Sequence, residues 1–497
     1  MLGGALPAVE TPQLTYDRSE RVAPGVSYRE RRFVRAGDGP FTLQVLEVDP
    51  AHPAINILPV RAFDRAVGKE TVRSMARRYG AAAAVNGGYF VVSGPYAGVS
   101  NGVYQMNGRA ISGGSNRTAL LFCEETGYKE RTEIDVVSFH GTVTAADGST
   151  QGISKLNGER DSQDLVLYRS PFGPSTLTDS SGVEAVLNAS GSVVRVDDRV
   201  GNAVLPAGGM VLSGSGRSAD WLRTHATVGA RLRIDLRLTP SVPPEKSGCK
   251  AEAMVGGGPR LVSRGKINVP EEKFAHAALR HPRTAFALTR RGTFLFVTLD
   301  GRQPSSVGMT LRELAAELIE MGAVEAMNLD GGGSTTMVVR GAVRNSPSDG
   351  KERPVSDAIL IFSVPDLDAL AHLIDRLANG QISANLLRKI REIVRSARGN
   401  RAELASLLRL LERAGSRDIS PAAAYLIREA VAAPHPARLR VQGRLSVANA
   451  LLTHQEPKCE RRRTGPVMQP AAARRASASR ASSGCRPNKD RTSARRA

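Results

Sequence analysis

The stretch "GMTLRELAAELIEMGAVEAMNLDGGGSTTMVV", residues 308–339, carries the signals of a helix, a buried strand and a glycine-rich turn in succession. Thr310 followed three residues later by Glu313 is the pattern of a capping box, which starts a helix. The apolar residues that follow lie at helical spacing and predict one buried stripe, made of Leu311, Leu314, Leu318 and Met321. Gly322 ends this helix, and residues 323–329 predict a strand that leads into the turn.

A second unit of the same plan lies closer to the N-terminus, in "ETVRSMARRYGAAAAVNGGYF" at residues 70–90. The helical stripe here is Val72, Met75, Ala76 and Tyr79. In both units an asparagine follows the helix-ending glycine by six residues, Asn86 after Gly80 and Asn328 after Gly322. A helix and strand that deliver a polar group to the strand's carboxyl end are a common way for α/β folds to build a site.

Strand-like runs fill the chain around these two units, and they set the predicted fold class. We expect an α/β protein in which a mixed, sheet-dominated α+β catalytic body spans residues 31–365. Leu and Ile at spacings of 3 to 4, interrupted by glycines, predict a small helical bundle at 366–433, separate from the body. Residues 434–497 are predicted to be a disordered basic tail, and residues 1–30 a leader or signal remnant.

The formal net charge of +20 comes mostly from that tail. Residues 434–497 hold 15 Lys/Arg and 3 Asp/Glu, a net of +12 that leaves +8 for the first 433 residues. With aromatic residues at only 4%, the composition disfavours base stacking on single strands, and we expect no specific nucleic-acid ligand. The tail could still contact nucleic acid or another anionic surface through its charge.

The four cysteines lack the spacing of a zinc or thioredoxin motif. Cys123 and Cys249 would pair in an exported protein, or stay as buried thiols in a reducing compartment. The sequence contains no run of 18 apolar residues, so we expect no transmembrane segment. The start "MLGGALPAVETP" is too short and too uncharged for a complete signal peptide, although it could be the remnant of one.

The turn in "NLDGGGSTTMVV", residues 328–339, is the strongest candidate for chemistry. Glycines without Cβ let the backbone approach a ligand and let successive N–H groups converge on an anion. Asp330 at its edge would serve as a base, a nucleophile or a metal ligand. The alternative is an ordinary hairpin in which Asp330 only forms the turn.

Other candidates come from two further strand ends and two proline-flanked arginines. Asp300 and Arg302 follow the apolar run "TFLFV", although Asp-Gly is also a common turn. Arg283 and Arg353 each abut a proline that fixes the local backbone, which would suit an arginine held for oxyanion recognition. A surface position is the alternative for both.

These residues lie in segments that resemble the phosphodiester glycosidase family over roughly residues 30 to 364. The segments occur in the family's order, and they are "AAVNGGYF", "GGGPRLVSRGK", "HPRTAFAL", "LDGR", residues 308–339 and "NSPSDGKERPVSDAILIF". The helical segment after Pro365 more weakly resembles small modules appended to secreted bacterial enzymes. Both resemblances imply a location outside the cytoplasm, in the cell envelope or the extracellular space.

The resemblance implies hydrolysis of a sugar-1-phosphodiester to a free sugar and a phosphomonoester. An oxocarbenium-like transition state needs a carboxylate, and a departing phosphate needs arginines or backbone N–H groups more than a strong general acid. We therefore expect Asp330 and Asp300 as catalytic carboxylates, with Arg302 and Arg283 beside the phosphate. The expected substrate-binding residues are Asn86, Gly87, Gly88, Asn328, Gly331, Gly332, Gly333, Ser334 and Arg353. No cofactor is expected, apart from a possible Ca²⁺ or Mg²⁺.

Three alternatives accompany this expectation. The chain could be a non-catalytic carbohydrate-binding protein of the cell surface that has kept the fold. It could bind nucleic acid through residues 434–497. It could also be a metal-dependent phosphodiesterase with Asp300 and Asp330 as ligands, although the eight histidines are scattered and give no recognisable ligand spacing.

Overall fold

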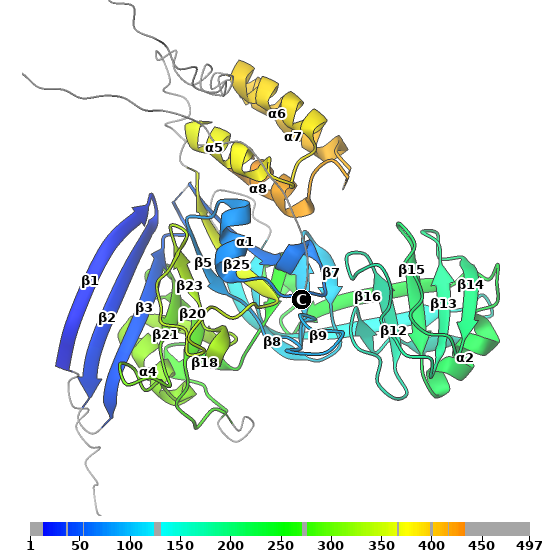
Figure 1. Cartoon of the computed structure of the whole chain (residues 1–497), viewed down its shortest axis with the longest axis horizontal. Helices are drawn as coiled ribbons and strands as arrows, with labels where there is room; N and C mark the ends of the chain where they lie inside the picture. The colour runs from blue at the N-terminus through cyan, green and yellow to red at the C-terminus, as the bar shows by residue number, and fades with distance from the viewer. Residues whose placement is uncertain are drawn as a thin grey trace, which may run out of the picture. The chain divides into compact units, whose positions relative to one another are not determined.

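The computed structural model describes residues 13–35, 38–52, 54–123, 131–270, 276–364, 367–397, 401–415 and 417–432. Residues 1–12 of the expected leader and the expected basic tail at 434–497 lie outside the described residues. Within the described part the chain is dominated by β-strands arranged in four sheets, with helices at intervals and at its C-terminal end (Figure 1). The predicted mixed, sheet-dominated fold is thereby confirmed.

Two of these sheets carry the site residues that were predicted from the sequence. The strands of the eight-stranded sheet are, in spatial order, β1 (Gln13–Ala23), β2 (Val26–Arg35), β3 (Gly39–Val48), β21 (Phe294–Leu299), β20 (Arg283–Thr289), β22 (Ala323–Asn328), β18 (Arg260–Ser263) and β19 (Lys266–Ile267). The strands of the inner five-stranded sheet are β24 (Ala342–Val343), β23 (Met337–Val339), β5 (Ala83–Asn86), β25 (Asp357–Ser363) and β4 (Ile55–Arg61). All pairings in both sheets are antiparallel.

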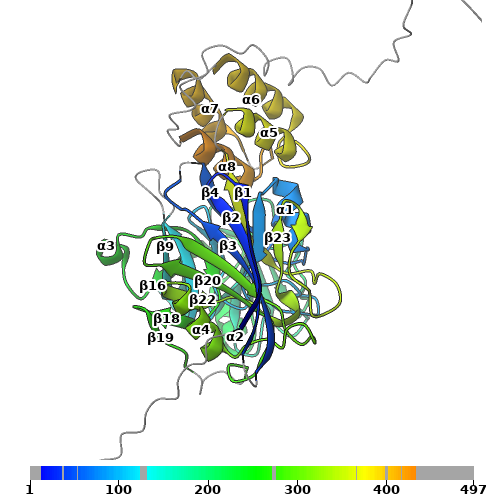
Figure 2. The same ribbon diagram turned by 90° about the vertical axis from the view of Figure 1, so that its left-hand side faces the viewer.

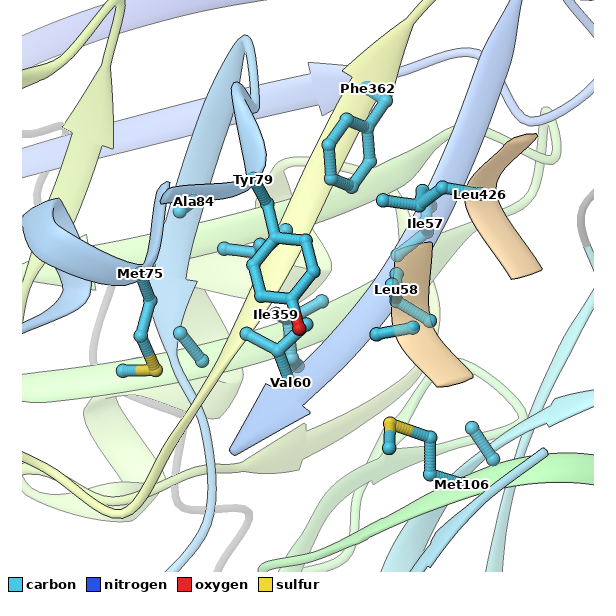
Figure 3. Close-up of a cluster of buried hydrophobic side chains, with 14 of the residues drawn as sticks. Ile57, Leu58, Val60, Met75, Tyr79, Ala84, Met106, Ile359, Phe362 and Leu426 are labelled. Atoms are coloured by element: carbon cyan, nitrogen blue, oxygen red, sulfur yellow. The ribbon is translucent and has the colours of Figure 1, made fainter. Parts of the chain in front are cut away.

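The central strands β20 and β21 of the eight-stranded sheet are buried on both faces. Along β20, Ala285 and Ala287 pack with helix α4 (Leu311–Glu320), whereas Phe286 between them packs with residues of the inner sheet. Figure 3 shows part of the apolar cluster that contains Phe286 and the inner sheet, in which Tyr79 lies beside Ile359 of β25. Strands covered on both sides read as continuous apolar runs, which explains the sequence of β20 and β21.

The two predicted helix–strand units are confirmed. Helix α4 begins with the capping box of Thr310 and Glu313 and precedes β22. Helix α1 (Val72–Tyr79) is capped by the Thr71 side chain, ends at Gly80 in the left-handed conformation (φ 70°) and precedes β5. The predicted stripes are buried in both helices, apart from Met321, which is half-buried.

The remaining two sheets form an extension of the body. The strands of the seven-stranded sheet are β10 (Thr150–Gly152), β9 (Thr132–Thr144), β8 (Arg117–Cys123), β17 (Ala251–Gly256), β6 (Tyr104–Met106), β7 (Arg109–Ser112) and, paired with β9, β16 (Arg233–Pro240). The strands of the outer five-stranded sheet are β11 (Lys155–Leu156), β12 (Leu165–Arg169), β15 (Met210–Gly214), β13 (Val183–Leu187) and β14 (Val193–Asp198). Helix α2 (Arg217–His225) packs on β13 and β15 of the outer sheet.

Cys123 and Cys249 form a disulfide, which decides between the two possibilities left open by the sequence. The bond joins the end of β8 to the segment before β17, and it lies in a small apolar cluster that includes Val103, Leu121 and Met254. None of the helices in the described part of the chain has the length and apolar character of a membrane span.

The prediction of a leader over residues 1–30 is wrong for residues 13–30, which lie in β1 and β2. These strands pair over nearly their whole length, and β2 pairs with β3. Most side chains of β1 are exposed, and the sequence "QLTYDRSERVA" therefore shows charged residues where a buried strand would show apolar alternation. Its pairing partners, and not its own sequence, place it in the sheet.

The C-terminal segment is helical as predicted, but it is not separate from the body. Its helices are α5 (Leu367–Leu377), α6 (Ala384–Ala397), α7 (Arg401–Arg413) and α8 (Pro421–Ala432) (Figure 2). Leu426 of α8 lies beside Ile57 of β4 in one continuous apolar cluster (Figure 3). The Asn107 side chain also donates a hydrogen bond of 3.1 Å to the carbonyl of Pro421.

Candidate active site

The glycine-rich turn after Asp330 links two sheets. Strand β22 ends at Asn328 in the eight-stranded sheet, and β23 begins at Met337 in the inner sheet. The intervening residues Gly332–Ser334 form a short 3-10 turn in which Gly332 has a φ of 61°. The alternative of a simple hairpin is therefore wrong, because the two flanking strands do not pair with each other.

Asn86 fastens this turn to both sheets. Its Nδ2 donates to the carbonyl of Asp330 at 2.7 Å. Its Oδ1 accepts from the Thr284 hydroxyl at 2.8 Å and from the Thr336 N–H at 3.0 Å. The N–H of Asp330 in turn donates to the carbonyl of Gly87 at 3.0 Å. The structure thus brings the two asparagine-glycine segments together, with Asn86 buried between them.

Asn328 lies at the end of β22 and binds an aromatic neighbour. Its Nδ2 donates to the Tyr89 hydroxyl oxygen at 2.6 Å, and that hydroxyl donates to the carbonyl of Gly258 at 2.9 Å. Within the described part of the chain, the buried Asn328 Oδ1 has no hydrogen-bond partner. Tyr89 follows Gly88 in the segment "AAVNGGYF", but no local pattern there distinguishes it as a site residue.

The carboxyl group of Asp330 has a pKa raised to about 7, and its burial is the main cause. The Ser334 hydroxyl and the charge of Arg353 lower this pKa, whereas the neighbouring Asp357 raises it. A carboxyl group with such a pKa changes its charge near neutral pH, which is the property that acid–base or nucleophilic catalysis requires.

Two arginines predicted from the sequence flank the turn. Arg302 Nη2 lies 3.4 Å from the position that a Cβ on Gly332 would occupy, and the same group contacts His281 Nδ1 at 3.1 Å. Arg353 pairs with Asp349 at 2.7 Å. A side chain on Gly333 would collide with both members of that pair, so only glycine lets them approach the turn.

A third arginine near the turn was not predicted. Arg117, at the start of β8, lies over the Tyr89 ring, with its guanidinium carbon 5.1 Å from the ring centroid. Asp330 and Arg117 both influence the pKa of Tyr89. Among the described residues, neither Arg117 nor Arg302 has a carboxylate within ion-pair distance, so their positive charges are not compensated. Nothing in "SNRTALLF" distinguishes Arg117 from a surface arginine.

Arg283 is buried, and its side chain donates hydrogen bonds to main-chain carbonyl groups. Its Nε donates to the carbonyl of Met309 at 2.9 Å, and its Nη2 donates to those of His276 and Leu279 at 2.9 and 2.7 Å. Burial lowers its pKa to about 10. Its charge lies close enough to lower the pKa of His281 as well, so it adds to the positive potential near the turn.

Asp300 lies at the end of β21, in different surroundings from Asp330. Its carboxylate accepts from Gln44 Nε2 at 3.0 Å and from the Ser346 N–H at 2.9 Å. It lines a cavity of about 510 Å³ together with Glu30, Arg32 and Arg344, among others. Burial raises the pKa of Asp300 to about 6. The two candidate carboxylates therefore have different hydrogen-bond partners.

One loop nevertheless contacts both carboxylate environments. Ser346 binds Asp300, while Asn345 accepts from the N–H of Met337 at 2.8 Å and donates to the carbonyl of Thr335 at 2.9 Å. In sheet terms, Asp300 follows β21 and Asp330 follows β22, the two neighbours of β20. Two strand spacings, about 10 Å, thus separate their backbones.

Asp357 is a further acidic residue that the sequence did not reveal as part of the site. Its Oδ1 accepts from the Gly88 N–H at 2.8 Å, and its Oδ2 contacts Arg61 Nη1 at 3.3 Å. Both side chains are about 1% exposed, which makes this a fully buried ion pair. Arg61 and Asp357 face each other in the register of β4 and β25. Because the two residues lie far apart in the sequence, no local pattern predicts this ion pair.

No group of three His, Cys, Asp or Glu side chains in the described part of the chain is arranged to hold a metal ion. Asp330 and Asp357 are neighbours, but their other contacts are with arginine, serine and glycine. The arrangement combines a carboxyl group that can titrate, a glycine turn and uncompensated arginines, and such a set can bind a phosphate next to a reacting centre.

Replacement of Asp330 by Asn should stabilise the protein at alkaline pH. Because the pKa of Asp330 is about 7 in the folded state and about 3.9 when unfolded, the folded state holds the proton more tightly. The stability from this proton is complete below pH 4 and is lost as the pH rises through 7. We expect Asp330→Asn to raise the free energy of unfolding by about 1–3 kcal/mol at pH 8 and by little at pH 4.

Urea unfolding of both proteins at the two pH values measures this difference. Asp235→Asn is the matched control, because Asp235 is exposed and its pKa is lowered by Arg237, so no gain at pH 8 is expected. Equal stability of Asp330→Asn and the wild type at pH 8 would contradict the raised pKa.

Comparison with known proteins agrees with the resemblance seen in the sequence. The chain is 33% identical over 117 residues, 24% of its length and 18% of the relative's, to the "SPbeta prophage-derived uncharacterized protein YomE" of Bacillus subtilis. It is 42% identical over 67 residues, 14% of its length and 12% of the relative's, to N-acetylglucosamine-1-phosphodiester alpha-N-acetylglucosaminidase of Bos taurus. The matches thus span less than a fifth of these curated relatives.

A solved structure has a similar fold. It is a Burkholderia pseudomallei protein described as exported, with 23% identity and a TM-score of 0.63 over 72% of this chain and 98% of that one. The sequence model of the phosphodiester glycosidase family matches residues 181–362, which include Arg283, Asp300, Asp330 and Arg353. The match to the phosphodiester glycosidase family is thus confined to residues 181–362, and β5 with Asn86, which binds the Asp330 carbonyl, lies outside the matched segment.

Proposed function

We propose that this protein hydrolyses a sugar-1-phosphodiester. In this reaction the bond between the anomeric carbon and the phosphate oxygen breaks, and the phosphomonoester leaves with the bonding electrons. The oxygen of water ends on the anomeric carbon, and the sugar is released. The observation that supports the proposal best is the buried Asp330 carboxyl group at the start of the glycine turn, with Arg302 close to Gly332 of that turn and Arg117 over the neighbouring Tyr89 ring.

The residues divide between the two halves of the substrate. Arg302 and Arg117 would bind the phosphate oxygens, because guanidinium groups match oxyanions and these two have no acid partner among the described residues. Arg353 and the turn from Gly331 to Ser334 would complete that pocket. Asp330, as a carboxylate, would stabilise or attack the anomeric carbon as positive charge develops there.

The remaining predicted residues receive proposed roles in support of this centre. Asn86, Gly87 and Gly88 hold the turn. Asn328 with Tyr89 would bind sugar hydroxyls through the Asn328 Oδ1, which has no hydrogen-bond partner among the described residues. Asp300 would act from the adjoining cavity, either on the attacking water or on the substrate. Arg283 would contribute its charge while fixing the segment around Met309.

The Asp330→Asn variant should lose hydrolysis of a panel of glycosyl-1-phosphate diesters by about 10³-fold or more in kcat, because the charge needed at the anomeric carbon is absent. Arg302→Gln should raise KM for the diester by about 10-fold or more by removing a phosphate contact. Free reducing sugar released by the full chain, with and without EDTA, is the readout.

Asp235→Asn serves as the matched carboxylate control and should retain wild-type rates. An Asp330→Asn variant that hydrolyses the panel normally would eliminate the catalytic role of Asp330. Sugar binding without turnover by the wild type, with or without divalent ions, would instead favour a non-catalytic carbohydrate-binding protein of the same fold.

The pH dependence provides a separate test. The pKa of Asp330 is about 7 and that of Asp300 about 6, and both carboxyl groups are proposed to act in their ionised forms. We therefore expect kcat/KM to rise with pH between about 5.5 and 7.5 and to level off above that range. A kcat/KM that falls through the same range would show that the protonated form of Asp330 is required.

We also propose that the protein works outside the cytoplasm, in the envelope or beyond it. The disulfide between Cys123 and Cys249 supports this location, because such bonds persist in oxidising compartments. In protein isolated without reductant from its native host, both cysteines should resist alkylation until a reductant is added. Mass spectrometry of the alkylated peptides measures this, and labelling of both thiols before reduction would contradict export.

A further inference from the structure

A second site lies away from the Asp330 turn, where helix α1 meets helix α5. The two helices pack against each other, and a cavity of about 470 Å³ is bordered by α1 along its length and by the C-terminal end of α5. We call it the arginine pocket, and its lining residues are Thr71, Arg73, Ser74, Arg77, Arg78, Arg376 and Asn379. The charged members of this lining are all arginines.

Two of these arginines have no counterion in the part of the chain that the structure describes. Arg78 is neutralised by Asp64 at 2.7 Å and Glu70 at 2.9 Å, and Arg73 lies 3.5 Å from Glu352. In contrast, the side chains of Arg77 and Arg376 make no ion pair and no hydrogen bond with another described residue. The pocket therefore carries two positive charges that the surrounding protein does not offset.

The convergence of these charges is not explained by the helices alone. An arginine in the last turn of a helix gains about 0.3–1 kcal/mol from the helix dipole, which accounts for Arg77 on α1 and Arg376 on α5 separately. It does not account for two such turns meeting at one pocket, because like charges repel each other. A bound anion would remove that repulsion.

Arg376 is seated closely against α1. A Cβ on Gly80 would lie 2.6 Å from Arg376 Cδ, so only a glycine at this position leaves room for the arginine stem. Because Gly80 also ends α1 in the left-handed conformation, one residue both stops the helix and admits Arg376. Partial burial lowers the pKa of Arg376. The stem of Arg376 is thus held against Gly80 at the pocket, although the residue as a whole is exposed.

We propose that the arginine pocket binds a phosphate group. Guanidinium groups bind phosphate oxygens with paired N–H donors, and the Thr71 hydroxyl and the Asn379 amide add neutral donors at the same rim. The phosphate could be free in solution or part of a phosphodiester polymer. The pocket exists only where α5 packs on α1, so the C-terminal helices contribute to binding and not merely to stability.

Isothermal titration calorimetry of the full chain tests this proposal with pyrophosphate and with soluble poly(glycerol phosphate). Titrations are made in an Arg302→Gln background, which weakens phosphate binding beside Asp330. We expect saturable binding that the double variant Arg77→Gln/Arg376→Gln weakens by at least 10-fold, and that weakens further between 50 and 200 mM salt. Binding of both probes indicates a free phosphate site, and binding of the polymer alone indicates a polymer site.

Arg388→Gln is the matched control, because Arg388 is an exposed arginine of the same helical segment whose side chain donates a hydrogen bond to Asn385. It should leave binding unchanged, and thermal unfolding checks that every variant is folded. Absence of binding for both probes, or equal binding by the double variant, would overturn the proposal. With Arg302 intact, the Arg77→Gln/Arg376→Gln variant should hydrolyse a small diester at the wild-type rate, so a failure of the proposed activity is seen separately.

Discussion

The hydrogen bonds of one buried amide, that of Asn86, hold together the parts on which the candidate site depends. This side chain reaches Asp330 on the turn, Thr284 on β20 and Thr336 at the start of the inner sheet. A buried amide that lost these partners would leave several polar groups unsatisfied, each at a cost of about 1–3 kcal/mol. The position of the Asp330 backbone is therefore set by the joining of two sheets, and not by the flexible glycines that follow it.

Burial and positive charge act in opposite directions on the Asp330 carboxyl group. Burial dominates and raises its pKa, although Arg353 lies close enough to lower it. A phosphate bound by Arg302 and Arg117 would use part of this positive potential. The buried pair of Arg61 and Asp357 supports the site in two ways. Asp357 accepts a hydrogen bond from the Gly88 N–H, and its charge raises the pKa of Asp330. Such a pair is costly to bury, which suggests that its placement serves the site.

Local signals predicted the parts of the fold that local interactions determine. The capping box of α4 and the left-handed Gly80 are readable in the sequence because each depends on residues within one or two turns. The pattern of an asparagine six residues after a helix-ending glycine led to the correct expectation that Asn86 and Asn328 lie at strand ends near the Asp330 turn.

Signals that depend on distant partners were missed. Arg61 and Asp357 are 296 residues apart, and only the register of β4 against β25 makes them a pair. Strand β1 is mostly exposed and charged, so its own residues do not identify it as a strand. Arg117 is identified as a site residue only by its contact with the Tyr89 ring, and the sequence does not show that contact.

The C-terminal helices illustrate how a short segment can change the chemistry of a larger body. Periodicity predicted the helices correctly, because amphipathic spacing is a local property. It did not predict that Leu426 would share the core with Ile57, since both segments show the same apolar character whether they pack together or apart. Once they do pack together, α5 places Arg376 over Gly80 and next to the last turn of α1. The packing of the C-terminal helices on the body thus buries apolar side chains and also brings positive charges together at its edge. An anion bound there would reduce the repulsion between those charges.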